Sequence, residues 1–414
     1  MRSQRFNVAS ALTLFLVLLA SSHLRAQDND VRLRKLYDDR NWFELRAAVQ
    51  KVSAPAFYQG AVACAFADGS TCEKKMSEHL GTKPHDDEAV EAHRILASFY
   101  LRSGKYRQAF GEVTAILSER PNDSDALSVR ALLESLSRVP DEKVEGAGTA
   151  LLNLANGGIP FSVNGMQATY WFDTGANLSI MSESEAKRLK LQVQDIAATM
   201  GVMTGERVGF RLAVANDLRI ASVRLKNVVF LVFPDDQAPF NQQPSGSRGL
   251  LGLPVLLGLQ TFAWEGKKFE IHPKPLGAVL EAVSKADLCF DGNYPVVQVG
   301  FGNRKLAFTL DTGASNTDLY PPFASVAPEM IRTAEKTSSY KMEGVGSTKN
   351  LDAAILPLVN FTIGGFPVVL KPAGVLLKPT LETSKFFAGN LGIDLLQQAH
   401  RVTFDFAAMT LTLQ

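Results

Sequence analysis

The stretch YWFDTGANLSIM, residues 170–181, is repeated in outline by AFTLDTGASNTDLY, residues 307–320. In each, an apolar run precedes Asp-Thr-Gly-Ala, and a hydroxyl residue, Ser179 or Thr317, stands six positions after the aspartate. A single Asp-Thr-Gly is common in tight turns, where the aspartate accepts a local backbone N–H and the glycine takes a positive φ. Two copies at matching places indicate two loops that meet.

The sequence around the two motifs repeats as well. Each motif is followed by a polar segment containing glycine, at 199–209 and 341–350, and then by a glycine in an apolar setting, Gly252 or Gly392. The aspartates of the two motifs are 138 positions apart, and these later glycines are 140 apart. So small a difference over a whole unit indicates a duplication. A duplication predicts two lobes related by a pseudo-two-fold axis.

Strand patterns dominate the C-terminal two-thirds of the chain. LRIASVRLKNVVFLVF (218–233) alternates, and FTIGGFPVVL (361–370) carries a Gly-Gly hairpin signal. Strand-length segments separated by Gly, Asn and Pro continue to the C-terminus. We therefore expect two all-β lobes, at 151–275 and 288–414, joined by a connector at 276–287.

The region before the lobes, residues 27–138, has helical periodicity, with apolar residues at three- and four-residue spacing. Within it, residues 90–123 have the small residues, the turn glycine Gly104 and the terminating Pro121 of a helical hairpin. The length of about 34 residues resembles a tetratricopeptide repeat, and about three hairpins are expected because one repeat cannot bury its own faces. A generic helical bundle is the alternative. Residues 139–150, which contain helix-breaking Pro and Gly, are predicted to be a linker.

The N-terminus has the pattern of a secretory signal peptide, predicted over residues 1–26. Arg2 and Arg5 precede an apolar run, residues 7–20, that is short for a mature membrane-spanning helix. An uncleaved anchor is the alternative. The expected location is secreted or periplasmic, with no membrane span after cleavage.

Composition and cysteine usage exclude several functions. The net charge of +1, without a basic block interleaved with aromatics, predicts binding to neither nucleic acid nor an anionic membrane. Cys64 and Cys72 can close a short loop in an oxidising compartment, and Cys289 is expected to be a buried small apolar residue. The six His are scattered, and neither HExxH nor GxSxG occurs. We therefore expect no metal and no cofactor.

The two loops carry residues suited to acid–base chemistry. If they meet, Asp173 and Asp311 lie at short range, where two like charges cannot both ionise easily, so the pair holds one proton. The ionised member can take a proton from a water held between them, and the protonated member can polarise a substrate carbonyl. This predicts amide hydrolysis without a covalent intermediate.

The neighbours of the two aspartates fit the same chemistry. Gly175 and Gly313 would let the backbone approach a carboxylate without a side-chain clash. The hydroxyls of Thr174 and Thr312 would bond across to the opposite loop and hold the two loops in register. The later glycine of each half would let another segment pass close behind the loop.

The two DTGA motifs and the two downstream apolar-Gly elements resemble the aspartic proteases. The likeness is greatest to a bacterial retropepsin-like aspartyl protease with two fused lobes and helical repeats in front. This resemblance implies two pseudo-symmetric β-barrel lobes, catalytic roles for Asp173 and Asp311, and a hairpin flap over the substrate. The candidate flap tips are Met203, Thr204, Gly205, Gly344, Val345 and Gly346.

The halves depart from the family pattern at two places. Pro254 stands in the first half where the second has Asp394, and the first half lacks a flap tyrosine of the pepsin kind, its nearest aromatic being Phe210. Flap contacts and subsite preferences therefore cannot be carried over.

Two functional hypotheses follow. The first is an exported aspartic endopeptidase of the cell envelope that cuts a peptide or protein in the interlobe cleft, its helical domain shading that cleft or delivering substrate. The second is a catalytically inactive scaffold whose helical repeats bind a partner protein.

Overall fold

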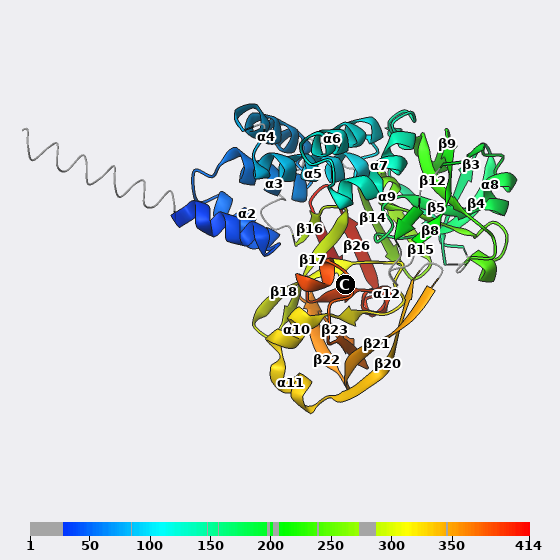
Figure 1. Ribbon diagram of the computed structural model, residues 1–414. Coiled ribbons are helices and arrows are strands. Elements are labelled where there is room, and N and C mark those ends of the chain that lie inside the picture. Colours follow the sequence, from blue (N-terminus) through cyan, green and yellow to red (C-terminus); the bar gives the residue numbers. More distant parts are fainter. Residues whose placement is uncertain are drawn as a thin grey trace, which may run out of the picture.

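The chain forms a helical region followed by two β-rich lobes (Figure 1). The computed structural model describes residues 28–83, 85–146, 148–155, 157–196, 199–201, 207–237, 240–272, 287–344 and 347–414. The predicted signal peptide and residues 276–286 of the predicted connector lie outside these ranges. Among the described helices, none has both the length and the hydropathy that crossing a membrane requires.

The helical region begins with helical residues 28–38 and continues with antiparallel helices. Aspartate side chains cap three of these helices: Asp68, Asp86 and Asp123 each accept a hydrogen bond from a first-turn backbone N–H. The helices are α2 (Trp42–Val49), α3 (Ala56–Ala65), α4 (Gly69–Thr82), α5 (Asp87–Arg102), α6 (Tyr106–Glu119) and α7 (Ser124–Leu136).

The predicted hairpin within residues 90–123 is confirmed as α5 and α6. Gly104 turns the chain between them at a φ of 68°, and α6 ends just before Pro121. A disulfide joins Cys64 of α3 to Cys72 of α4, and Cys289 is buried, as expected. That the hairpins are tetratricopeptide repeats stays a prediction.

The first lobe contains a ten-stranded sheet and a separate hairpin of β7 (Thr199–Gly201) and β8 (Arg207–Gly209). Helices α8 (Glu183–Arg188) and α9 (Leu253–Leu259) and the 3₁₀ turn η1 (Phe240–Gln242) complete it. In spatial order the sheet contains β1 (Lys143–Glu145), β11 (Val223–Lys226), β10 (Leu218–Ile220), β3 (Ile159–Val163), β4 (Met166–Phe172), β13 (Gly249–Leu251), β5 (Ser179–Ser182), β12 (Val228–Phe233), β9 (Arg211–Ala215) and β6 (Val193–Gln194).

The second lobe also contains a ten-stranded sheet. Its helices are α10 (Pro321–Val326), α11 (Pro328–Thr333), α12 (Ile393–Leu396) and the 3₁₀ turn η4 (Thr383–Lys385). In spatial order the sheet contains β20 (Glu335–Gly344), β21 (Ser347–Leu356), β24 (Ala373–Leu376), β19 (Asp318–Leu319), β25 (Gly389–Leu391), β18 (Arg304–Leu310), β17 (Tyr294–Phe301), β22 (Val359–Ile363) and β23 (Phe366–Leu370), with β16 (Leu288–Asp291) paired to β17.

The two lobes repeat the same strand connections. In the first, β13 lies between β4, to which it is parallel, and β5, to which it is antiparallel. In the second, β25 lies in the same way between β18 and β19. The predicted all-β region with two pseudo-symmetric lobes is therefore confirmed.

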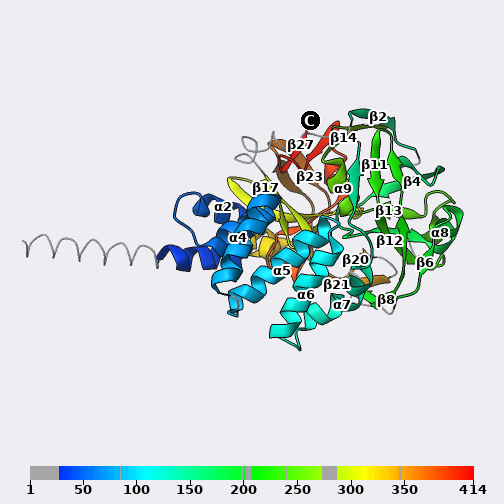
Figure 2. The ribbon, with the colours of Figure 1, turned by 90° about the horizontal axis from the view of Figure 1, so that it is seen from above.

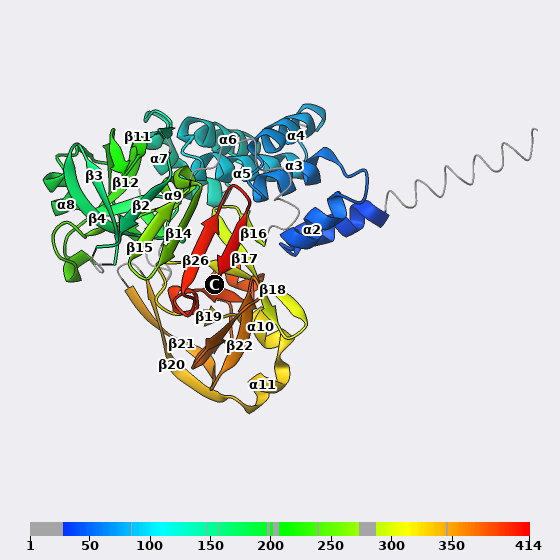
Figure 3. The same ribbon diagram turned by 180° about the vertical axis from the view of Figure 1, so that it is seen from behind.

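A third sheet joins the lobes (Figure 3). Strand β14 of the first lobe pairs along its length with β26 of the second, so that Phe262 lies opposite Phe404. Their rings stack with centroids 5.2 Å apart. The five strands are, in order, β2 (Ala150–Asn153), β15 (Lys268–Ile271), β14 (Thr261–Glu265), β26 (Arg401–Asp405) and β27 (Thr410–Leu413).

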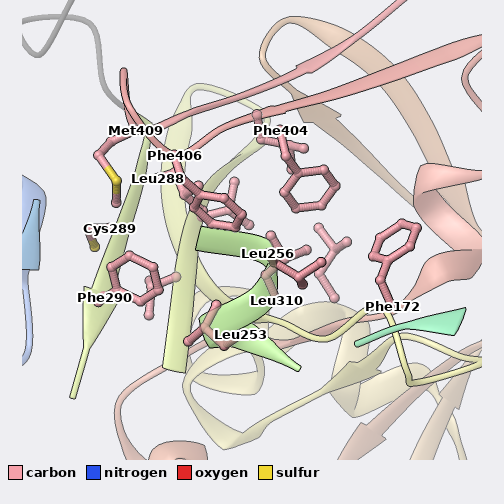
Figure 4. Close-up of a cluster of buried hydrophobic side chains, with 14 of the residues drawn as sticks. Phe172, Leu253, Leu256, Leu288, Cys289, Phe290, Leu310, Phe404, Phe406 and Met409 are labelled. Carbon is pink, nitrogen blue, oxygen red and sulfur yellow. The ribbon is translucent and has the colours of Figure 1, made fainter. Parts of the chain in front are cut away.

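A shared apolar core lies beneath this third sheet (Figure 4). It includes Phe172 and Leu310, the residues that directly precede the two Asp-Thr-Gly-Ala motifs, and both are buried. The Phe172 ring contacts those of Phe262 and Trp264, at centroid distances of 5.4 and 5.2 Å. One rigid core therefore supports both loops.

The segment predicted as a linker, residues 139–150, differs from that expectation. Residues 143–145 form β1, which pairs with β11 at the edge of the first-lobe sheet. Just before it, Glu142 is bonded to the Tyr106 hydroxyl and to the Val229 N–H, the latter at 3.2 Å. Pro140 ends the helical pattern, but these bonds fix the segment against the lobe.

The helical region contacts both lobes (Figure 2). Its helices share an apolar cluster with strands of the first lobe. Toward the second lobe, Arg102 donates to the Gly292 carbonyl at 2.8 Å and Trp42 donates to Asp291 at 3.0 Å. The turn between β16 and β17 is thus held by α2 and α5.

Candidate active site

The two Asp-Thr-Gly-Ala loops meet through a reciprocal set of threonine hydrogen bonds. The Thr174 N–H donates to Thr312 Oγ1 and the Thr312 N–H donates to Thr174 Oγ1, both at 3.1 Å. Each hydroxyl in turn donates to a carbonyl of the opposite strand, Thr174 to Leu310 at 2.9 Å and Thr312 to Phe172 at 3.0 Å. Both threonines are buried. This exchange fixes one loop against the other.

Each loop is also fixed to its own lobe at the end of a strand. The Asp173 N–H donates to the Leu251 carbonyl at 2.9 Å, and the Asp311 N–H donates to the Leu391 carbonyl at 3.0 Å. These bonds continue the parallel pairing of β4 with β13 and of β18 with β25. The two aspartates therefore occupy equivalent positions.

The later glycines let the chain pass directly behind each loop. A Cβ on Gly252 would lie 2.5 Å from the Leu178 carbonyl carbon, and one on Gly392 would lie 2.7 Å from that of Asn316. Their N–H groups donate to the hydroxyls of Ser179 and Thr317, at 3.0 and 2.9 Å. The hydroxyl six positions after each aspartate thus binds the crossing strand.

The two carboxyl groups lie against each other's loops. A Cβ on Gly175 would be 2.6 Å from Asp311 Cγ, and a Cβ on Gly313 would be 2.4 Å from Asp173 Oδ2. No side chain larger than hydrogen fits at either position. The structure therefore places both predicted aspartates and both predicted glycines in one site, with the threonines beneath them.

The ionisation of Asp173 is set by its surroundings and by the second carboxyl group beside it. Burial, and then the negative charge of Asp311, raise the pKa of Asp173 well above its ordinary value. The Gly175 N–H donates to Asp173 Oδ1 at 2.8 Å and opposes this shift without overcoming it. Asp173 therefore holds a proton at pH values where an ordinary aspartate has lost it.

The carboxyl group of Asp311 has a different set of donors. The N–H groups of Gly313 and Ala314 donate to its Oδ1 at 3.0 and 3.1 Å. Its Oδ2 accepts from Asn390 Nδ2 at 3.3 Å. We did not predict Asn390 from the sequence, although a signal was present: the second half reads GNLGID where the first reads GLLGLP.

Two further acidic residues belong to this part of the second lobe: the charge of Asp318 interacts with that of Asp311 and with that of Asp394. Asp318 accepts from the Tyr340 hydroxyl at 2.5 Å, and burial raises the pKa of Asp318. Asp394, which stands where the first lobe has Pro254, accepts from the Thr317 hydroxyl at 2.6 Å. The second lobe thus has a carboxyl group bonded to the Thr317 hydroxyl where the first lobe has a proline.

The candidate flap tips fall between paired strands. Met203, Thr204 and Gly205 follow β7 and precede β8, and they lie outside the described residues, as do Val345 and Gly346. Gly344 ends β20 and pairs with Ser347 at the start of β21. Flap roles for all six positions stay predictions.

A group of three potential metal ligands lies in the helical region, away from the two loops in sequence. His79, Asp86 and Glu88 have ligand atoms within 4.8 Å of one another. Lys83 Nζ already lies 3.8 Å from both carboxylates and supplies a positive charge there. This arrangement is that of an ion-pair cluster at a helix N-terminus.

Part of the first lobe is similar to a known protein family. Residues 159–255, which include the Asp173 loop and the crossing strand behind it, match a family described as aspartyl protease. Over these residues the first lobe is similar in sequence to aspartyl proteases. The predicted resemblance to aspartic proteases is thereby confirmed for this region, and the second lobe repeats its strand connections.

Two solved structures of aspartic proteases are similar to the chain. A retropepsin-like aspartic protease from Rickettsia conorii is 17% identical, over 32% of this chain and 94% of that one, with a TM-score of 0.22. An aspartic proteinase from Irpex lacteus is 12% identical, over 64% of this chain and 96% of that one, with a TM-score of 0.38. No curated protein matches the chain significantly.

Proposed function

We propose that the protein is an aspartic endopeptidase that hydrolyses peptide bonds with water activated between Asp173 and Asp311. The observation that carries this proposal is the reciprocal bonding of Thr174 and Thr312, because it brings two aspartates of matching position into one site. The aspartyl protease match of residues 159–255 supports the reaction class.

The proposed reaction begins with one proton on the pair. The ionised aspartate takes a proton from the water while the water oxygen bonds to the substrate carbonyl carbon. The protonated aspartate gives its proton to the carbonyl oxygen. The resulting diol collapses when the C–N bond breaks. The leaving nitrogen takes the proton from the first aspartate, and the second aspartate recovers one from a diol hydroxyl. Both aspartates return to their starting states.

The substrate in this proposal is an extended peptide bound between the two lobes. The β7–β8 and β20–β21 hairpins are the proposed flaps over it. The β20–β21 hairpin is attached to the site by the bond from Tyr340 to Asp318.

We also propose export through the N-terminal signal peptide, residues 1–26. The disulfide between Cys64 and Cys72 supports an oxidising compartment, because such bonds are rare in the cytosol. A bacterial cell envelope or the extracellular space is the proposed location.

For the helical region we propose a role in controlling access to the cleft. Its contacts with both lobes support this role, because a body packed against both can limit their relative movement. Binding of a separate partner protein is the alternative role.

The test is cleavage of an unfolded mixed peptide library by residues 27–414 at several pH values. Asp173→Asn and Asp311→Asn should each abolish cleavage, whereas Asp195→Asn, at a surface aspartate, should not. Cleavage that survives both dyad substitutions would disprove the proposal. A folded parent chain that cuts nothing at any pH would favour the inactive binding protein.

A further inference from the structure

The two aspartates differ in one side-chain hydrogen bond. Asn390 on β25 places Nδ2 3.3 Å from Asp311 Oδ2. The strand register of the first lobe shows what stands at the equivalent place. Thr309 lies opposite Asn390 in the β18–β25 pair, and Trp171 lies opposite Leu250 in the β4–β13 pair. The Leu250 side chain has no polar atom, so within the described part of the chain this bond has no counterpart from the equivalent position in the first lobe.

The Asn390 amide is hydrogen-bonded on its other side as well. Thr309 Oγ1 donates to Asn390 Oδ1 at 2.7 Å, and both residues are about 95% buried, with exposed fractions of 5% and 6%. With its oxygen bonded to a hydroxyl, the amide presents its NH₂ group to Asp311. An ionised carboxylate only accepts hydrogen bonds, so this orientation matches the charged form of Asp311.

We propose that Asn390 is a positioning residue that keeps Asp311 as the ionised member of the pair, so that Asp311 is the general base and the proton resides on Asp173. A donor directed at a carboxylate favours its charged form, whereas burial without such a donor favours the neutral form. The roles in hydrolysis rest on the proposed function, but the position of the proton does not require turnover.

The other groups that face Asp311 are consistent with this assignment. The carboxyl groups of Asp173 and Asp318 and the hydroxyl of Tyr320 all lie close enough to interact with its charge. A negative charge on Asp318 would oppose ionisation of Asp311, and burial raises the pKa of Asp318, which reduces that opposition. Burial and the charge of Asp311 raise the pKa of Asp173, so the pair retains one proton for Asn390 to direct.

The first test titrates each aspartate in a full chain whose other aspartate has been replaced by asparagine. NMR of ¹³C-labelled carboxyl groups monitors the titration. In an Asp173→Asn background, Asn390→Leu should raise the pKa of Asp311 by about one unit, the size expected for loss of one charge-assisted hydrogen bond. In an Asp311→Asn background the same substitution should leave the titration of Asp173 unchanged.

The controls separate this effect from general damage. Asn360→Leu, at an exposed asparagine of β22, should shift neither aspartate. Leucine is the residue that the first lobe has at the equivalent position, Leu250, so the Asn390→Leu variant should fold, and thermal unfolding checks this. Thr309→Val is the second variant, because it removes the hydroxyl that holds the amide and should shift Asp311 in the same direction by less.

The second test is the pH dependence of kcat/KM on a peptide substrate. Asn390→Leu should move the acid limb of the profile to higher pH, because that limb reports the base, and should leave the alkaline limb in place. An unchanged Asp311 titration in folded Asn390→Leu and Thr309→Val chains would overturn the assignment, as would a shift of Asp173 instead. If Asn390→Leu shifts the Asp311 titration but the parent chain cuts no peptide, the role of Asn390 is supported and the proposed function is contradicted.

Discussion

The hydroxyl of Thr174 accepts a hydrogen bond from the backbone N–H of Thr312, and the hydroxyl of Thr312 accepts one from Thr174. Each hydroxyl donates as well, to the carbonyl before the opposite aspartate. Four bonds thus depend on two side chains 138 residues apart. This arrangement joins the lobes at the point where their chemistry is proposed to occur.

Replacing one of these hydroxyls should weaken both folding and catalysis. Thr174→Val leaves the Thr312 N–H and the Leu310 carbonyl without their partner in a buried site, which costs about 1–3 kcal/mol of unfolding free energy for each unsatisfied group. Thr174→Ser keeps the hydroxyl and should recover most of the loss. Urea unfolding and peptide cleavage measure the two effects, with Thr412→Val, on the exposed face of β27, as the control. Equal stability of the Thr174→Val and Thr412→Val chains would contradict this reasoning.

Gly313→Ala should abolish cleavage with no general loss of the fold. The added methyl would lie 2.4 Å from Asp173 Oδ2, so the Asp173 carboxyl must move away from its partner. The matched control is Gly111→Ala in α6, where no atom lies within 4 Å of the new methyl. Helix propensity favours alanine there by about 1 kcal/mol. Initial rates on one peptide compare the variants, and near-parent activity of Gly313→Ala would show that the two carboxyl groups do not need this approach.

The pKa of Asp173 predicts an unusual dependence of stability on pH. Because its folded value is raised, the folded state binds more protons than the unfolded state from about pH 3.9 upward, until the raised pKa is passed. Stability therefore falls as the pH rises through this window. Asp173→Asn cannot ionise, so it should be more stable than the parent near neutral pH and equal to it below about pH 3.

Urea unfolding of the parent and of Asp173→Asn at a series of pH values measures this difference. Asp195→Asn, at a side chain that is 93% exposed, should follow the parent throughout. A stability difference between parent and Asp173→Asn that does not change with pH would rule out the raised pKa.

Arg102 should be needed to hold the helical region on the second lobe. It is buried, donates to the Gly292 and Cys64 carbonyls, and lies over the Phe290 ring, while burial lowers its pKa to about 9. Arg102→Met keeps part of the apolar contact and removes both hydrogen bonds, each worth about 1.5–3 kcal/mol when the donor is charged. Hydrogen exchange of residues 288–294 should then rise, whereas Arg32→Met, at an exposed arginine, should leave it unchanged.

The paired site could be predicted from the sequence because its parts are local and occur twice. The spacing of Asp173 and Asp311 against Gly252 and Gly392 revealed the duplication, and the need for glycine beside a carboxylate follows from elementary sterics. The sequence shows that Ser179 and Thr317 match in position, but it does not show what their hydroxyls bind. Their function depends on a strand that arrives more than seventy residues later, which no local pattern contains.

Other features could not be predicted because they depend on packing between distant segments. Residues 139–150 contain helix breakers, which indicate where a helix ends but not that β1 pairs with β11. The contact of Asn390 with Asp311 depends on strand register within the second lobe. A position-by-position comparison of the two halves indicates Asn390. Residues 249–252 read GLLG and residues 389–392 read GNLG, so position 390 is where the two segments differ.

The pairing of β14 with β26 has a consequence for how the two halves depend on each other. Each half, made as a separate chain, would expose the unpaired edge of β14 or β26 beside apolar rings such as Phe262 or Phe404. Exposed strand edges of this kind pair readily with strands of other chains. Two identical copies of one half could meet edge to edge, just as the two different halves do here. The fused chain therefore holds within one molecule an interface of the kind that joins two chains, and a protein split between β15 and β16 should reassemble when its halves are mixed.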